Sequence, residues 1–198
     1  MQDLLIENIH NVCAAEYDRE YCRLDDSLKS RIDRMKNIDS KHRTLLGRML
    51  ARNAVRHVCG ADADGISISV DARGKPYAPG YDCCISISHS GDWVVCAFGT
   101  SVVGVDIELV RTIDIRLVKR VCTTNEYEYV LGSHMQEFGM ITDVDVLRRF
   151  FEIWTLKEAY FKALGTGITN FKSDDVLASE RERRTYYSDG YVISVIYA

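Results

Sequence analysis

The chain carries the same order of expected elements twice. A long segment of helical periodicity, at residues 40–59 and again at 148–164, is followed each time by short segments in which apolar and polar residues alternate. The two halves also end alike, in SGDWVVCAFG and in SDGYVISVIYA. This repeated order indicates an α+β fold built from two similar halves. We place the boundary near residue 104, which gives halves 1–104 and 105–198.

The alternation of apolar and polar residues predicts the strands. We expect them at residues 3–9, 65–70, 83–88, 93–99, 102–109, 171–177, 184–188 and 191–197. Gly60 and Gly165 follow the two long helical segments and are typical helix ends. Residues 74–80 predict a turn, and residues 132–146 show no clear period, so we expect a loop or a short helix there.

Composition limits the function classes. The 198 residues are 46% hydrophobic, enough for a substantial core, and the net charge of −4 argues against general nucleic-acid binding. The N-terminus lacks a basic region, and no apolar run approaches the roughly 20 residues of a membrane span, so we expect neither a signal peptide nor a membrane protein. Seven cysteines without a Cys-x-x-Cys pair favour reduced thiols in the cytoplasm.

Two acids stand two residues apart in the expected strand at 102–109. Asp106 and Glu108 should share one face of it, with Val105 and Ile107 facing the core. Paired carboxylates suit a hard divalent cation such as Mg²⁺, which prefers oxygen ligands. The alternative is a solvated strand end that carries two surface acids.

A third acid lies within an aromatic stripe of the second long helix. Glu158 shares a helical face with Phe151, Trp154 and Phe161, and a charge placed there needs a partner. Lys162, four residues later, is one candidate for a simple salt bridge. The other is a metal ion shared with the strand acids, in which case Lys162 would face the phosphates of a substrate.

The first half offers groups that suit an anion. His89 lies between two serines where a strand gives way to a turn, and imidazole, hydroxyl and turn N–H groups there can hold a phosphate. Lys75 and Pro76 offer a basic side chain and a rigid backbone against which a flat ring could lie. The basic stretch at 29–56 adds Arg31, Lys41, Arg43 and Thr44. A surface histidine and a solvated basic helix face are the alternatives.

Five motifs in order connect these signals. They are HRTLLG at 42–47, GKPY at 74–77, ISISHSGDWVV at 85–95, GVDIE at 104–108 and WTLKEAYFKALGTGI at 154–168. The series closely resembles the 4′-phosphopantetheinyl transferases, in particular the long, two-half type that activates peptide and polyketide synthetases. The resemblance covers about residues 29 to 197.

The resemblance implies an activity and its partners. The chain would act as a holo-acyl-carrier-protein synthase, transferring the 4′-phosphopantetheine arm of coenzyme A to a serine of an apo acyl or peptidyl carrier protein, with release of adenosine 3′,5′-bisphosphate. It would depend on Mg²⁺ and work as a cytoplasmic monomer without nucleic-acid or membrane partners. The resemblance also implies two halves related by a pseudo-twofold axis, with the active site in the cleft between them.

Residue roles follow from the same resemblance. Asp106, Glu108 and Glu158 match the Mg²⁺ ligands, and Lys162 matches the lysine that touches the phosphates. Glu158 is one candidate base for the carrier serine, and Glu126 matches a second carboxylate near the site. The coenzyme A contacts would come mainly from the first half: Arg31, Arg43, Thr44, Lys75, Pro76, Ser88 and His89.

Two other functions stay open. A non-catalytic coenzyme A or nucleotide-binding module on the same fold should have lost a carboxylate or Lys162, and none is missing. An unrelated Mg²⁺-dependent phosphohydrolase would not need the GKPY and SHSG elements. For an acidic carrier protein, the plausible contacts are the bases after the metal strand, which an ordinary charged helix face would also explain: Arg111, Arg116, Lys119 and Arg120.

Overall fold

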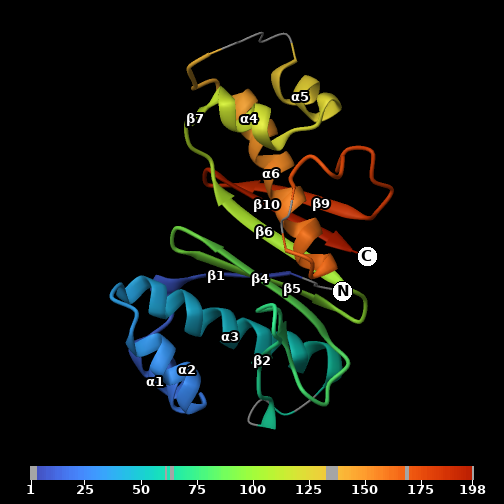
Figure 1. Cartoon of the computed structure of the whole chain (residues 1–198). Helices are drawn as coiled ribbons and strands as arrows, with labels where there is room; N and C mark the ends of the chain where they lie inside the picture. The colour runs from blue at the N-terminus through green and yellow to red at the C-terminus, as the bar shows by residue number, and fades with distance from the viewer. Residues whose placement is uncertain (1–3, 61, 63–64, 133–137, 168–169, 198) are drawn as a thin grey trace. The chain divides into compact units, whose positions relative to one another are not determined.

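The chain divides into two compact units, Met1–Ser101 and Val102–Ala198. The computed structural model (Figure 1) describes residues 4–60, 62, 65–132, 138–167 and 170–197. Each unit has a long helix packed on an antiparallel sheet, which confirms the predicted α+β fold with two similar halves. The division comes slightly before the expected boundary at residue 104, because strand β6 (Val103–Leu109) belongs wholly to the second unit.

The first unit is a five-stranded sheet with helices beside it. Its strands pair in the order β1-β5-β4-β3-β2, and all neighbours are antiparallel. The strands are β1 (Leu4–Asn8), β2 (Ser69–Val70), β3 (Pro76–Tyr77), β4 (Cys84–Ser90) and β5 (Trp93–Gly99). The helices are α1 (Ala14–Cys22), α2 (Asp26–Asp33) and α3 (Ile38–Cys59), with a 3-10 turn at Ile9–Asn11.

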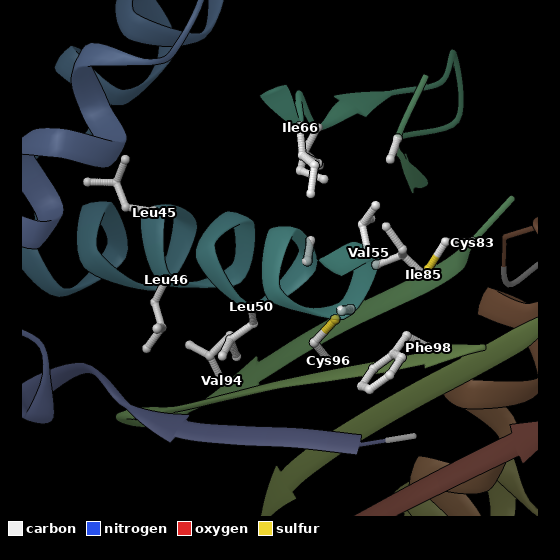
Figure 2. Close-up of a cluster of buried hydrophobic side chains, with 14 of the residues drawn as sticks. Leu45, Leu46, Leu50, Val55, Ile66, Cys83, Ile85, Val94, Cys96 and Phe98 are labelled. Atoms are coloured by element: carbon white, nitrogen blue, oxygen red, sulfur yellow. The ribbon is translucent and has the colours of Figure 1, made fainter. Parts of the chain in front are cut away.

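Helix α3 lies on β4 and β5 and forms the core of the first unit. The Asn37 side chain accepts the N–H groups of Asp39 and Ser40 and so begins the helix, and Gly60 ends it at a φ of 63°, as predicted. Figure 2 shows the apolar face of α3 directed at the sheet. The packed side chains include Leu46, Leu50 and Val55 of the helix and Ile85, Val94, Cys96 and Phe98 of the strands.

The second unit has a three-stranded antiparallel sheet in the order β6-β10-β9. Residues Asp189 and Gly190 connect β9 and β10, both at positive φ, as a two-residue hairpin turn requires. The remaining elements are α4 (Ile115–Val121), α5 (Thr124–Leu131), α6 (Val144–Leu164), β9 (Arg183–Ser188), β10 (Tyr191–Tyr197) and the small pair β7 (Ile113–Asp114) with β8 (Met140–Ile141).

A glycine permits α6 to touch β6. A Cβ atom at Gly104 would lie 1.9 Å from the Ala159 carbonyl oxygen and 2.7 Å from the Ala163 nitrogen, both on the α6 backbone. Only a residue without a side chain allows this approach. The first residue of the GVDIE motif therefore serves packing, and it sets α6 directly over the strand that carries Asp106.

The strand predicted at 65–70 is wrong except for its last two residues. Ile66 and Ile68 are buried, which explains the alternation, but their carbonyl groups accept hydrogen bonds from Arg52 and Arg48 of α3. Arg52 also pairs with the buried Glu20 of α1, at 2.8 Å. The segment is thus held by helix side chains, and only Ser69–Val70 joins the sheet.

The strand predicted at 171–177 is also wrong, since no strand forms in these residues, all of which are described. The ammonium group of Lys157, buried on α6, donates to the carbonyls of Phe171 and Asp174, at 2.6 Å each. As in the segment at 65–70, hydrogen bonds from a helix side chain take the place of the backbone hydrogen bonds of a strand.

The segment 132–146 holds β8, and α6 begins at Val144, earlier than predicted. Asp143 caps α6 by accepting the N–H groups of Asp145 and Val146. Residues 133–137 lie outside the described part of the chain, as do Asp3 of the first predicted strand and Ile168 of the last motif.

We expect Gly104→Ala to destabilise the second unit by about 3 kcal/mol or more, because the added methyl group meets helix backbone rather than a flexible side chain. Chemical denaturation monitored by circular dichroism would measure the loss. Gly99→Ala is the matched control, because its Cβ would meet nothing closer than 3.9 Å. Equal stability of the two variants would contradict the close approach of α6 to β6.

Candidate active site

The acids of β6 point toward α6. Asp106 is only 5% exposed, and its Oδ1 atom accepts a hydrogen bond from Lys162 Nζ of α6 at 2.6 Å. Asp106 stands opposite Ser194 of β10, whose hydroxyl lies 2.7 Å from that of Thr155 on α6. Asp106 is therefore not part of a solvated strand end.

The opposite face of β6 is buried as well. Val105 and Ile107 are inaccessible there, as predicted, although the hydrophobic cluster around α6 does not include them. The two acids alternate along β6 with these buried apolar residues.

Glu108 lies near the outer end of β6. Its carboxylate is partly exposed and accepts a hydrogen bond from Arg111 Nη1 at 3.1 Å. The Arg111 guanidinium lies over the ring of Phe151, 5.3 Å from its centroid. Arg111 was expected to contact a carrier protein from a helix, but it precedes α4 and binds an acid of the site.

Glu158 is electrostatically coupled to both strand acids. Burial, together with the negative charges of Asp106 and Glu108, raises the pKa of Glu158 from 4.5 to about 7, and the Lys162 ammonium only partly offsets the rise. Both strand acids thus act on Glu158, while their joint binding of a metal stays a prediction. Lys162 is more than a helical salt-bridge partner for Glu158, since its ion pair reaches across to Asp106.

The donor set suits a divalent cation. Three carboxylates supply the oxygen ligands that Mg²⁺ prefers, and their mutual repulsion marks a local excess of negative charge. Within the described residues, no three His, Cys, Asp or Glu side chains are already arranged as a metal-binding cluster. Lys162 is the cation that neutralises Asp106 in this structure.

Glu126 is a structural residue. It is fully buried, and its carboxylate lies 2.9 Å from Lys157 Nζ and accepts the backbone N–H groups of Thr123 and Val176. A carboxylate engaged in this way has no access to a substrate. The prediction of Glu126 as a residue near the reacting centre is therefore wrong, and its T-x-x-E capping box with Thr123 was the sequence signal for the structural role.

The β4–β5 turn gathers several of the expected phosphate contacts. His89 is exposed near the end of β4, while Ser88 is buried. Arg43 Nη1 donates to the Gly91 carbonyl at 2.9 Å and so joins α3 to this turn. Thr44 follows on α3, where its hydroxyl donates to the Ser40 carbonyl at 2.9 Å.

Two cavities in the first unit contain the remaining predicted contacts. One of about 440 Å³ is lined by Arg31 together with Arg34 and Arg48, which sequence reasoning did not select. The other, of about 350 Å³, is lined by Lys75 and Pro76. Tyr77 lines both cavities, so they are neighbours. The density of basic residues at 29–56 was the only sequence signal for the two additional arginines.

Comparison with known families matches each unit separately. Residues 11–101 match the family model described as 4′-phosphopantetheinyl transferase, N-terminal. Residues 102–195 match the model of the 4′-phosphopantetheinyl transferase superfamily. The division between the two matches coincides with the division between the structural units.

Individual relatives carry the same description. A 4′-phosphopantetheinyl transferase of Bacillus subtilis is 34% identical over 157 residues, which are 79% of this chain and 66% of the relative. The transferase gsp of Aneurinibacillus migulanus is 36% identical over 132 residues, 67% of this chain and 52% of that protein. The chain thus spans about half to two thirds of the length of these relatives. No described helix is both long and apolar enough to cross a membrane.

The raised pKa of Glu158 predicts a pH effect on the metal-free protein. The folded state binds the Glu158 proton more tightly than the unfolded state, so this residue's contribution to stability is full below pH 4.5 and is lost as the pH rises through about 7. We expect a loss of about 1 kcal/mol, since the group is partly solvated and screened. Thermal unfolding with a chelator would measure it, with Glu158→Gln as the comparison. Parallel pH profiles for both proteins would refute the coupling.

The burial of Glu126 predicts a loss of stability on substitution. Glu126→Gln should cost about 3–5 kcal/mol, because it leaves the Lys157 ammonium buried without its carboxylate. The double variant with Lys157→Met should recover much of that loss. A double-mutant cycle in urea tests this expectation, and additive losses would show that the pair is not coupled.

Proposed function

The chain belongs to the 4′-phosphopantetheinyl transferase superfamily, and on this premise we propose that it transfers the 4′-phosphopantetheine arm of coenzyme A to a serine of an apo acyl or peptidyl carrier protein. The observation that carries the proposal is the coupled group of Asp106, Glu108, Glu158 and Lys162. The serine oxygen would bond to the β-phosphorus, and adenosine 3′,5′-bisphosphate would leave.

We propose that Asp106, Glu108 and Glu158 hold Mg²⁺. The ion would neutralise the pyrophosphate oxygens of coenzyme A and the charge that develops on the leaving phosphate. The three acids would lose their mutual repulsion on binding it. Lys162, which now neutralises Asp106, would then be available to donate to a phosphate oxygen.

Glu158 is the proposed acceptor of the serine proton, directly or through a water molecule. A carboxylate is an effective base near neutral pH only when its pKa is raised toward that pH. Burial and the neighbouring acids raise the pKa of Glu158 to about 7, and Glu126 is excluded by its burial. Glu158 thus has the position among the acids that a base needs, and the raised pKa describes the metal-free site, since bound Mg²⁺ would lower it again.

The nucleotide portion of coenzyme A is assigned to residues of the first unit. Lys75 and Pro76 line a cavity of about 350 Å³, in which we place the adenine side. Arg31 lines the neighbouring cavity of about 440 Å³ and is assigned to the 3′-phosphate region. The residues on or beside the β4–β5 turn complete the proposed set: Arg43, Thr44, Ser88 and His89.

Cellular context follows from the same proposal. All seven cysteines are free thiols in this structure, which supports a reducing cytoplasmic environment. We propose that the protein works there as a monomer on coenzyme A and its carrier protein.

We expect the protein to add one phosphopantetheine arm to an apo carrier protein in the presence of coenzyme A and Mg²⁺. Asp106→Asn and Glu158→Gln should each lower kcat by about 100-fold or more, because each removes a charge from the reacting centre. Mass spectrometry of the carrier measures the product. Glu182→Gln, an exposed acid of the same unit, is the control. Turnover near the wild-type rate in either site variant would overturn the assignment.

The same assay distinguishes a transferase from a non-catalytic module that only binds coenzyme A. A non-catalytic module would bind coenzyme A in isothermal titration calorimetry but would modify none of a panel of apo carriers. Loss of the carrier's mass gain on chelation, and its return with Mg²⁺, would support the metal assignment.

A further inference from the structure

A third cavity, of about 330 Å³, lies in the second unit and shares no lining residue with the candidate active site. Three elements meet around it. Tyr129 belongs to α5, Tyr187 belongs to β9, and the other lining residues lie on α6: Asp145, Arg148, Arg149 and Glu152. We call it the α6 cavity. Its volume is at the lower end of the range for ligand sites, so it suits a small molecule.

Glu152 and two tyrosines form the wall of the α6 cavity. The Tyr129 hydroxyl donates to the Glu152 carboxylate at 2.7 Å. Burial and a hydrogen bond with Glu152 also raise the pKa of Tyr187 above its ordinary value. The rings stay 39% and 50% exposed, so both offer aromatic surface to a ligand. Each carboxylate oxygen accepts more than one hydrogen bond, so Glu152 can still accept from a further donor.

The charged residues of the α6 cavity do not neutralise one another. Asp145 and Arg148 are exposed and three residues apart, a spacing at which helical ion pairs commonly form. Within the part of the chain that the structure describes, neither of them takes part in an ion pair. Arg149 donates through Nε to the Val130 carbonyl at 2.9 Å, which holds its guanidinium group beside the cavity. Charges of both signs are therefore available to a ligand.

This charge pattern selects among ligand classes. Two acids and two bases line the α6 cavity, so an anion alone would meet two carboxylates and a cation alone would meet two guanidinium groups. A molecule that carries an ammonium and a carboxylate group close together can satisfy both signs. Guanidinium groups bind carboxylates in a bidentate manner, and carboxylates accept the hydrogen bonds of an ammonium group. The tyrosine rings add a surface for an apolar or aromatic substituent.

We propose that the α6 cavity binds a free α-amino acid with an apolar or aromatic side chain. The two arginines hold the carboxylate of the amino acid, the two acids accept its ammonium group, and its side chain lies against the two tyrosine rings. This site is separate from the acids that we assign to Mg²⁺. It therefore does not depend on the proposed transfer reaction, and each of the two can fail without the other.

Isothermal titration calorimetry with L-phenylalanine tests the ligand class. We expect a Kd of about 1 mM or below, which is ordinary for a ligand of this size. The analogue 3-phenylpropanoate lacks the ammonium group, and 2-phenylethylamine lacks the carboxylate. Each should bind about 10-fold more weakly or worse, because each leaves two charged residues unsatisfied. Equal affinity for all three compounds, or no binding of L-phenylalanine, would overturn the proposal.

Variants of the exposed charges locate the site. Arg148→Gln and Asp145→Asn should each weaken the binding of L-phenylalanine about 10-fold, since each removes a charge-assisted hydrogen bond. Both side chains are exposed, so the fold should persist, and thermal unfolding would verify this. Lys172→Gln and Glu182→Gln change an exposed base and an exposed acid of the same unit and are the controls. Unchanged affinity in both cavity variants would refute the site.

A titration with saturating coenzyme A present separates this site from the candidate active site. The affinity for L-phenylalanine should stay within about twofold of its value without coenzyme A, because the two ligands share no contact residue. Competition would place the amino acid in the coenzyme A site and so overturn the α6 cavity as its location. A protein that binds L-phenylalanine but modifies no carrier would contradict the proposed function alone.

Discussion

Buried ion pairs on the two long helices hold each unit together. In the first unit Arg52 of α3 pairs with Glu20 of α1 and donates to the Ile66 carbonyl. In the second unit Lys157 of α6 pairs with Glu126 of α5 and donates to the Phe171 carbonyl. Such pairs offset their desolvation only when further hydrogen bonds accompany them. Here the added bonds fix an irregular segment against each helix.

The position of α6 in turn creates the candidate active site. Gly104 lets the α6 backbone meet β6, and Lys162 of that helix then reaches Asp106. Glu158 is brought close enough for the strand acids to raise its pKa. The missing side chain of Gly104 and the buried Lys157–Glu126 pair thus fix the helix that carries Glu158 and Lys162. The GVDIE motif serves both packing and chemistry. Its glycine allows α6 to approach β6 closely, and its two acids form part of the candidate site.

Much of this could be predicted from the sequence, because it depends on local pattern. The strands at 93–99 and 191–197 have the predicted bounds, and both long helices end at the predicted glycines. The two wrong strands share one cause, namely that side chains of the preceding long helix, 14 and 17 residues away in the sequence, satisfy their carbonyls. Glu126 was misassigned for the same reason, since its partner Lys157 is distant in the chain. Periodicity reports which residues are buried, but it does not report which donor satisfies a buried carbonyl.

The charges of the site favour a ligand that carries both positive and negative charge. Three acids and one lysine face one another, and Lys162 is committed to Asp106 while burial and repulsion favour the protonated form of Glu158. A phosphate alone would compete for Lys162 and leave Asp106 buried without its ammonium, at a cost in desolvation. A divalent cation alone would displace Lys162 without giving it a new partner. A pyrophosphate bound together with a divalent cation would satisfy the acids and the lysine at once, and this balance of charge is the reason that we propose the two as a joint ligand.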